Sequence, residues 1–157
     1  MEKLTTWLWF DTEAEEAAEF YTSLFPGSRI TDVSYYGDAG PRPAGTVMTV
    51  GFELFGREFF GLNGGADHRI EGPGISLMVD CDSQEEVDRY WEKLADGGQE
   101  IACGWVTDRY GVAWQIVPRR LRELLADADP ERAQRAMAAM LKMTRIEIDE
   151  LERAAAA

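Results

Sequence analysis

Two side chains in the second half of the sequence could carry covalent or acid–base chemistry. Cys103 is the one plausible nucleophile, because a thiol attacks as the thiolate once a neighbouring base or cation favours ionisation. No histidine lies near it in sequence, and Arg109 could help only if it points inward. Asp108 could act as a general base if burial beside Trp105 and Tyr110 desolvated its carboxylate. The plainer interpretation is a cleft-edge thiol and a turn carboxylate, neither with a catalytic duty.

Metal chemistry has little support in the residue types. Catalytic transition metals are usually bound by imidazole, thiolate or carboxylate groups. The only histidine, His68, lies in a glycine-flanked segment that is predicted to be an exposed linker. The two cysteines, Cys81 and Cys103, lack the spacing of a metal or disulfide motif and are predicted to be reduced thiols. The sequence therefore predicts no metal and no cofactor.

Aromatic and neutral polar side chains recur in the segments expected to be strands, and the chain has five tryptophans. If alternate residues of each strand point inward, these side chains line a cavity. Such a cavity suits a flat, partly apolar ligand that a few hydrogen bonds orient. Any one tryptophan could equally fill the core. The candidate ligand-binding residues are Trp7, Trp9, Phe60, Asn63, Ser76, Met78, Cys103, Trp105, Trp114 and Gln115.

The elements that must position these residues begin with a strand over Leu4–Phe10, which is rich in aromatic residues. Thr12 and Glu15 have the spacing of a capping box and predict a helix start, and Pro26-Gly27 ends that helix. Three further strands are predicted, with a tight turn between the last two. They cover Ser28–Tyr36, Thr46–Leu54 and Arg57–Asn63.

The same order returns after about 70 residues, which indicates an internal repeat. A strand over Gly74–Asp80 precedes a second capping box at Ser83–Glu86, and Gly97-Gly98 stops the helix that follows. Three short strands are then predicted at Gln99–Cys103, Trp105–Asp108 and Val112–Val117. The sequence therefore predicts an α+β fold in which two tandem βαβββ modules, residues 4–65 and 74–118, make one domain over residues 1–118 and enclose a cleft.

Residues 119–157 have the character of a helical tail. Helices are predicted at Arg119–Ala126, Pro130–Met143 and Asp149–Ala156, and the second has proline in its first turn. Its apolar face could pack on the domain or on a dimer partner. That face consists of Ala133, Met137, Met140 and Leu141.

The net charge of −13 is carried by the part of the chain before the tail, because residues 119–157 hold eight basic and eight acidic residues. An acidic surface repels phosphate backbones and anionic lipid, so neither nucleic acid nor a membrane is expected as a partner. No segment approaches the roughly 20 apolar residues of a membrane span. The start, Met1–Leu4, lacks the apolar segment of a secretory signal. The protein is predicted to be cytoplasmic.

Six short motifs mark the two modules in order. They are Trp9-Phe10-Asp11, Glu19-Phe20-Tyr21, Leu62-Asn63-Gly64-Gly65, Cys103-Gly104-Trp105, Asp108-Arg109-Tyr110-Gly111 and Trp114-Gln115-Ile116-Val117-Pro118. Their order and spacing resemble the PhnB-like branch of the vicinal oxygen chelate superfamily, which includes glyoxalase I, bleomycin-resistance proteins and extradiol dioxygenases. The resemblance implies curved, half-open sheets with a ligand in the concavity. In the superfamily's enzymes it implies a divalent metal held by His, Glu or Gln on the first and fourth strands of each module.

The positions that match those metal ligands are Thr6 or a neighbour, Asn63, Ser76 and Gln115. All four are neutral, so the resemblance implies a superfamily member without the usual metal-ligand set. The branch is often labelled 3-demethylubiquinone 3-methyltransferase. However, the loop Gly61–Gly65 is followed by no predicted helix, and the glycine-rich strand–loop–helix that commonly binds S-adenosylmethionine is missing from the sequence.

Three functions stay open on the sequence alone. The first is a metal-independent protein that binds a small aromatic or partly apolar molecule, by similarity to the bleomycin-resistance members. The second is an enzyme, a methyltransferase or a glyoxalase-like lyase or isomerase, that uses Asp108, Cys103 or Gln115. The third is an interaction module without a ligand. Superfamily members commonly pair modules within or between chains, so a homodimer is expected in any of these cases.

Overall fold

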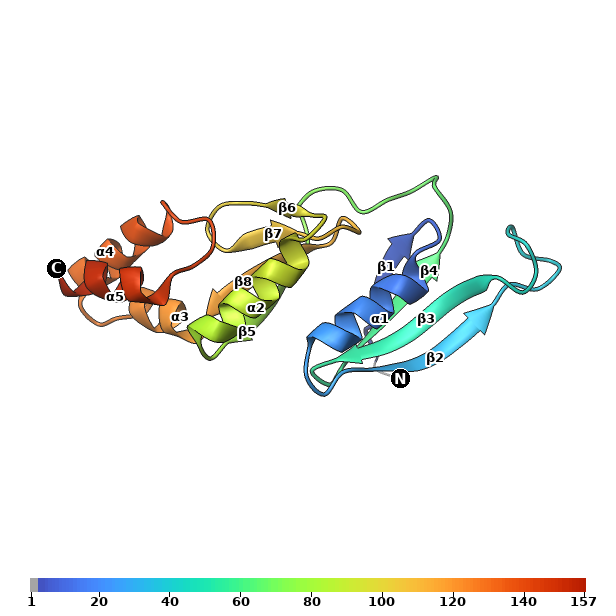
Figure 1. Cartoon of the computed structure of the whole chain (residues 1–157), viewed down its shortest axis with the longest axis horizontal. Helices are drawn as coiled ribbons and strands as arrows, with labels where there is room; N and C mark the ends of the chain where they lie inside the picture. Colours follow the sequence, from blue (N-terminus) through green and yellow to red (C-terminus); the bar gives the residue numbers. More distant parts are fainter. Residues whose placement is uncertain (1–2) are drawn as a thin grey trace. The chain divides into compact units, whose positions relative to one another are not determined.

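The computed structural model describes residues 3–157, so the first two residues of the predicted 1–118 domain lie outside the described range. The chain divides into two compact units between Ile70 and Glu71. Each unit contains a four-stranded sheet and the strand–helix–strand–strand–strand order expected from the sequence (Figure 1). The predicted α+β fold of two tandem modules with a helical tail is therefore confirmed.

The first unit consists of one helix on a mixed sheet. In chain order its elements are β1 (Thr6–Phe10), α1 (Ala14–Leu24), β2 (Arg29–Tyr35), β3 (Val47–Leu54) and β4 (Arg57–Asn63). The strand order is β1-β4-β3-β2, with β1 parallel to β4 and the other pairs antiparallel. The helix α1 lies along one face of this sheet (Figure 1).

Aromatic side chains fill the space between α1 and its sheet. The ring of Tyr21 on α1 lies 6.1 Å from that of Phe52 on β3, and Phe52 stacks on Phe59 of β4 at 5.6 Å. All three side chains are buried. Burial of such a side chain stabilises the folded state by roughly 1.5–3 kcal/mol. The face of β3 and β4 that carries Phe52 and Phe59 is thus the core face.

The start of α1 differs from the prediction. The helix begins at Ala14 after Glu13, whose side chain makes no capping hydrogen bond, so the predicted Thr12–Glu15 box is wrong. The amide of Ala14 instead donates to Oδ1 of Asn63 at 2.8 Å. Because the end of β4 supplies this acceptor, the helix needs no local cap.

The second unit repeats the module. Its elements are β5 (Ser76–Cys81), α2 (Gln84–Ala95), β6 (Gln99–Glu100), β7 (Trp105–Thr107) and β8 (Ala113–Pro118), in the strand order β5-β8-β7-β6. Here the predicted cap is confirmed, since Oγ of Ser83 accepts the amide of Glu86 at 3.2 Å. β6 is shorter than predicted, and Cys103, the last residue of the predicted strand, adopts a φ of 60°, which is outside the extended conformation.

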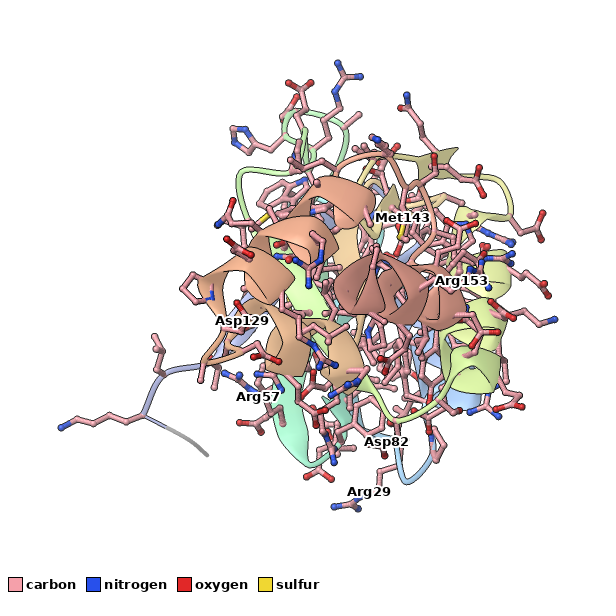
Figure 2. The ribbon with its side chains drawn as sticks, turned by 90° about the vertical axis from the view of Figure 1, so that its left-hand side faces the viewer. Arg29, Arg57, Asp82, Asp129, Met143 and Arg153 are labelled. Carbon is pink, nitrogen blue, oxygen red and sulfur yellow. The ribbon has the colours of Figure 1, made fainter. Side chains whose placement is uncertain are left out.

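Three helices, α3 (Arg119–Leu125), α4 (Pro130–Met140) and α5 (Ile148–Ala156), form the tail. Figure 2 faces this tail, with Asp129 at the start of α4 and Met143 just beyond its end. Asp129 caps α4 by accepting the amide of Glu131 at 3.0 Å. The helices share a buried cluster with the end of β8, namely Val117, Leu121, Leu124, Ala136, Met143, Ile146, Leu151 and Ala155.

The segment between α4 and α5 is attached to the rest of the second unit. The side-chain amide of Gln84, at the start of α2, donates to the carbonyl of Ile146 at 3.0 Å and accepts the amide of Ile148 at 2.8 Å. Arg145 forms ion pairs with Asp88 at 3.3 Å and with Glu147 at 3.0 Å. None of the helices in the described chain has the length and apolarity to span a membrane.

Candidate functional site

The alternation of side chains along β4 separates a core face from an open face. Phe59 and Asn63 are buried on the side that α1 covers, so Glu58, Phe60 and Leu62 point to the opposite side. The parallel register pairs Trp7 of β1 with Phe60, and Trp9 with Leu62. We call the side of this sheet that carries Trp7 and Phe60 the open face of the first unit.

A pair of stacked rings stands on this open face. The rings of Trp7 and Phe60 have centroids 4.7 Å apart and an interplanar angle of 15°. Phe60 also lies over the bare backbone of Gly51, where an added Cβ would come within 3.2 Å of its ring. Trp7 stands on an edge strand and remains 50% exposed. The structure therefore brings these two predicted ligand-binding residues together and leaves part of the indole uncovered.

Trp9, near the end of β1, is held in place by a hydrogen bond and by packing on glycine. Its Nε1 donates to the carbonyl of Gly65 at 2.8 Å. A Cβ at Gly64 would lie 2.2 Å from the indole atom Cζ2, so the ring packs directly on the glycine backbone. The ring of His68 meets the indole edge-on at 4.9 Å, although His68 is exposed, as expected for a linker residue. Trp9 thus holds the loop that follows β4 against the end of β1.

Asn63 does not reach the open face. It is only 5% exposed, and its side chain bonds to the amide of Ala14 at 2.8 Å and to the carbonyl of Val47 at 3.2 Å. The hydroxyl of Tyr36 donates to its backbone carbonyl at 2.7 Å. The structure gives Asn63 the role of joining α1, β3 and β4, and this role differs from the predicted contact with a ligand.

The second unit carries a small neutral polar pair. Nε2 of Gln115 on β8 donates to Oγ of Ser76 on β5 at 2.9 Å. Met78 and Trp105 are the cross-strand partners of Gln115 on β5 and β7, so the three share one face. Met78 is 48% exposed. We call this face, which is opposite the one bearing buried Ile116, the open face of the second unit.

Trp114 and Asp108 lie on the other side of this sheet. Trp114 is 2% exposed, and its Nε1 donates to Oδ2 of Asp108 at 2.9 Å. Oδ1 of Asp108 accepts the amides of Tyr110 and Val112 at 2.9 and 3.1 Å. Asp108 is itself 3% exposed. Both of its oxygens are occupied in holding the turn before β8, so the geometry assigns the carboxylate a structural role.

The two thiols have different surroundings. Cys103 is half-buried at the turn after β6, and its backbone amide donates to the carbonyl of Met143 at 2.8 Å. Cys81 is fully buried at the end of β5. Burial raises the pKa of the Cys81 thiol to about 12, and the nearby carboxylates of Glu86, Asp80 and Asp82 act in the same direction. Cys81 is therefore protonated and unreactive at neutral pH.

The four positions that the superfamily's enzymes use for a metal do not form a ligand set in either unit. Thr6 pairs in register with buried Phe59 and so shares the core side of the sheet with Asn63. Ser76 and Gln115 are on an open face, but they are neutral and bond to each other. Within residues 3–157, no three His, Cys, Asp or Glu side chains are grouped to hold a metal ion. These donors do not fit a divalent cation.

Of the candidate ligand-binding residues, Asn63 borders one of two hollows in the described chain and the others border neither. A cavity of about 370 Å³ is bordered by Asn63, Thr12, Arg42 and Thr46 near the start of α1. A shallow groove of about 890 Å³ between α2 and the tail is lined by Trp91, Glu100, Lys142, Arg145 and other charged residues. Neither hollow contains the stacked rings or the Ser76–Gln115 pair.

Comparison with known protein families gives one match that spans most of the chain. The model of the 3-demethylubiquinone-9 3-methyltransferase family matches residues 2–117. The chain belongs to this family. The match includes both modules and ends where the tail begins, so the tail is an addition to the family's common part. No curated protein matches the sequence.

Solved structures confirm the resemblance to PhnB-like proteins. The PhnB protein of Bacillus cereus is 39% identical, and the alignment covers 74% of this chain and 99% of that one with a TM-score of 0.68. Protein PA1353 of Pseudomonas aeruginosa is 24% identical over 75% of this chain and 98% of its own, with a TM-score of 0.61. The YycE protein of Bacillus subtilis is 17% identical, and the alignment covers 73% of this chain and 87% of that one with a TM-score of 0.52. The last two share the fold alone.

The family member thus presents two chemically distinct surfaces, one in each unit. The first offers a stacked aromatic pair, and the second offers a neutral hydrogen-bonding pair beside Trp105 and Met78. Sequence reasoning missed Glu58, which occupies the position two residues before Phe60 on the same open face. The signal was present, because residues two apart in a strand share a face. A carboxylate beside the predicted aromatic residues could have been picked out on that ground.

Proposed function

We propose that this protein binds a small, planar, partly apolar molecule on the open face of its first unit and does so without a metal ion. The observation that supports this most strongly is the stack of Trp7 on Phe60, with a centroid separation of 4.7 Å and half of the tryptophan exposed. Large aromatic side chains left partly uncovered beside polar groups are typical of surfaces that bind other molecules.

The exposed indole offers useful binding energy to a flat ligand. Covering roughly 100 Å² of apolar surface contributes about 2.5 kcal/mol. An offset ring–ring contact adds about 0.5–1.5 kcal/mol. Because Phe60 holds Trp7 against the sheet, the ring is already oriented and loses little freedom when a ligand stacks on it.

The neutral pair on the second unit offers hydrogen bonds of its own, independent of the stacked rings, to a molecule on that unit's open face. The Ser76 hydroxyl, which already accepts from Gln115, retains its own hydrogen for donation, and the Gln115 carbonyl oxygen is an acceptor. A pair of this kind recognises an adjacent acceptor and donor, as in an amide or a hydroxy-ketone. Neutral donors of this type also support metal-independent binding.

Ligand-observed NMR and calorimetry with quinoline, 2-naphthol and 1,4-naphthoquinone test the proposal. Trp7→Leu should weaken binding of all three at least tenfold, because it removes the stacking surface while keeping an apolar residue on the strand. Tyr35→Ser is the matched control, since Tyr35 is 58% exposed on β2, at the opposite edge of the same sheet. Saturable binding that is identical in both variants and in the unchanged chain would contradict the proposal, as would no binding at all.

We propose a homodimer as the assembly that covers part of these faces. Support comes from large apolar residues exposed on or beside the edge strands β1 and β5, with Ile75 85% and Met78 48% exposed. Sedimentation velocity on the full chain tests this assembly, and a monomer at micromolar concentration would contradict it. The chain is not proposed to be an enzyme that uses Asp108, because both oxygens of that carboxylate already serve the turn.

A further inference from the structure

An unsatisfied carboxylate oxygen lies on the open face of the first unit. Glu58 is the second residue of β4 and is partly buried. Its Oε2 is inaccessible to solvent and has no hydrogen-bond partner in the described chain. A buried oxygen without a partner costs roughly 1–3 kcal/mol, and more when it is charged. The first unit therefore carries, at this point, a negative group whose interactions are incomplete.

The position of Glu58 places this carboxylate beside the stacked rings. Glu58 and Phe60 are alternate residues of β4, so they share a face at a spacing of about 7 Å. Trp7 is the cross-strand partner of Phe60 and hence a diagonal neighbour of Glu58. The carboxylate and the exposed indole thus belong to one face, and a small molecule stacked on the indole would reach the buried Oε2 after a turn of the Glu58 side chain.

The neighbouring strand β3 places a second carboxylate opposite Glu58. Glu58 stands directly opposite Glu53 of β3, and like charges in this arrangement repel. Glu53 has a partner, since its carboxylate accepts from Nε of Arg29 at 3.0 Å. A further cation at Glu58 would relieve the repulsion that Arg29 relieves only in part.

We propose that the ligand of this face is an organic cation, a protonated amine or amidine carried by a planar ring. This inference rests on the proposed function and adds the charge of the ligand to it. The ring would stack on Trp7, and the cationic group would lie over the rings and against Glu58. Aromatic faces attract ammonium and guanidinium groups, and a neighbouring carboxylate reinforces the attraction.

A metal cation fits this place poorly. Hard cations require several oxygen ligands, whereas the one carboxylate directly opposite Glu58 in the register, that of Glu53, is already paired with Arg29. An organic cation makes use of the rings that a metal ion cannot use. The net charge of −13 also favours the approach of cations over anions.

Three indoles of similar size test the proposal by calorimetry on the full chain: tryptamine, 3-methylindole and indole-3-acetate carry positive, zero and negative charge. Tryptamine should bind about tenfold more tightly than 3-methylindole, and indole-3-acetate should bind most weakly. Glu58→Gln keeps the side-chain shape and should reduce the preference for tryptamine to less than threefold without changing the affinity for 3-methylindole. Glu19→Gln is the control, because it removes the same charge from an exposed position on α1.

The outcomes separate this inference from the proposed function. If 3-methylindole binds and responds to Trp7→Leu, but tryptamine shows no preference or Glu58→Gln leaves the preference intact, the cation inference is wrong and the stacking site stands. If none of the three indoles binds, both proposals fail. An equal loss of preference in Glu58→Gln and Glu19→Gln would assign the effect to net charge and would overturn the role of Glu58. Circular dichroism and thermal unfolding establish that each variant is folded.

Discussion

Asn63, at the end of β4, caps α1 from across the unit: its Oδ1 accepts the amide of Ala14 at 2.8 Å. The same side chain donates to the carbonyl of Val47 on β3 at 3.2 Å. One amide therefore joins a helix start to two strands. Because Asn63 is 5% exposed, removing its side chain leaves a largely buried amide and a carbonyl without their partners.

Asn63→Ala should lower the free energy of unfolding by about 2 kcal/mol, because a buried helix amide and a strand carbonyl lose their partners. Urea denaturation measures this loss, and hydrogen exchange at the Ala14 amide should accelerate more than at the middle of α1. Thr12→Ala is the comparison, since the sequence pattern makes Thr12 the cap and the structure does not. It should cost less than about 0.5 kcal/mol. An equal cost for the two variants would contradict the capping geometry.

Gly64→Ala should displace the indole of Trp9, because the new Cβ would lie 2.2 Å from Cζ2. Loss of the bond from Nε1 to Gly65, together with the repacking, should destabilise the chain by about 1–3 kcal/mol. The indole N–H resonance of Trp9 in a ¹H–¹⁵N NMR spectrum should move or broaden. Gly37→Ala serves as the control, since no atom lies within 4 Å of its added Cβ. An unmoved Trp9 resonance in Gly64→Ala would show that the contact is looser than described.

The buried thiol of Cys81 predicts a pH effect with a defined sign. Its pKa is about 12 in the folded chain, above the ordinary 9.0 that it regains on unfolding. The folded state therefore holds its proton more tightly, and this contribution to stability is complete below about pH 9 and is lost as the pH rises toward 12. In a Cys103→Ser background, urea midpoints should fall between pH 8.5 and 10.5 more steeply than in Cys81→Ala/Cys103→Ser. Parallel pH profiles would rule out this linkage.

The side chain of Gln84 helps to hold the tail on the second unit. Replacement by leucine keeps the bulk of the side chain but removes its two bonds to the backbone of Ile146 and Ile148. We expect Gln84→Leu to cost about 1–3 kcal/mol, and limited proteolysis should cut the segment between α4 and α5 earlier. Gln134→Leu, on an exposed position of α4, should leave both measurements unchanged. If the tail is cleaved at the same rate in both variants, the two hydrogen bonds of Gln84 do not hold it in place.

The order of the elements was predictable from the sequence because local signals are strong. Capping residues, apolar spacing and glycine turns placed every strand and helix to within a few residues, and the repeat supplied the fold. The start of α1 was missed because its cap comes from Asn63, distant in sequence. Thr12 has the local spacing of a capping residue, but the contact of Asn63 with the Ala14 amide takes the place of that cap.

The candidate site was harder to predict because each strand has two faces and both carry aromatic residues. Phe60 and Asn63 are three residues apart, and Trp114 and Gln115 are adjacent, so neither pair can share one face of a regular strand. The structure places Phe60 and Gln115 on open faces, and it buries Asn63 and Trp114. Alternation alone could have separated these pairs, but only the packing of α1 and α2 decides which face is core.

Part of the joint between the tail and the second module is made by main-chain atoms alone. The amides of Cys103 and Gly104, both in left-handed conformations, donate at 2.8 Å to the carbonyls of Met143 and Thr144. Since no side chain takes part in these two bonds, exposed Thr144 is free to change during evolution while the attachment persists. Exposed side chains in this segment can therefore be substituted while these two main-chain bonds persist. Relatives can thus differ in the surface of the tail and keep this attachment.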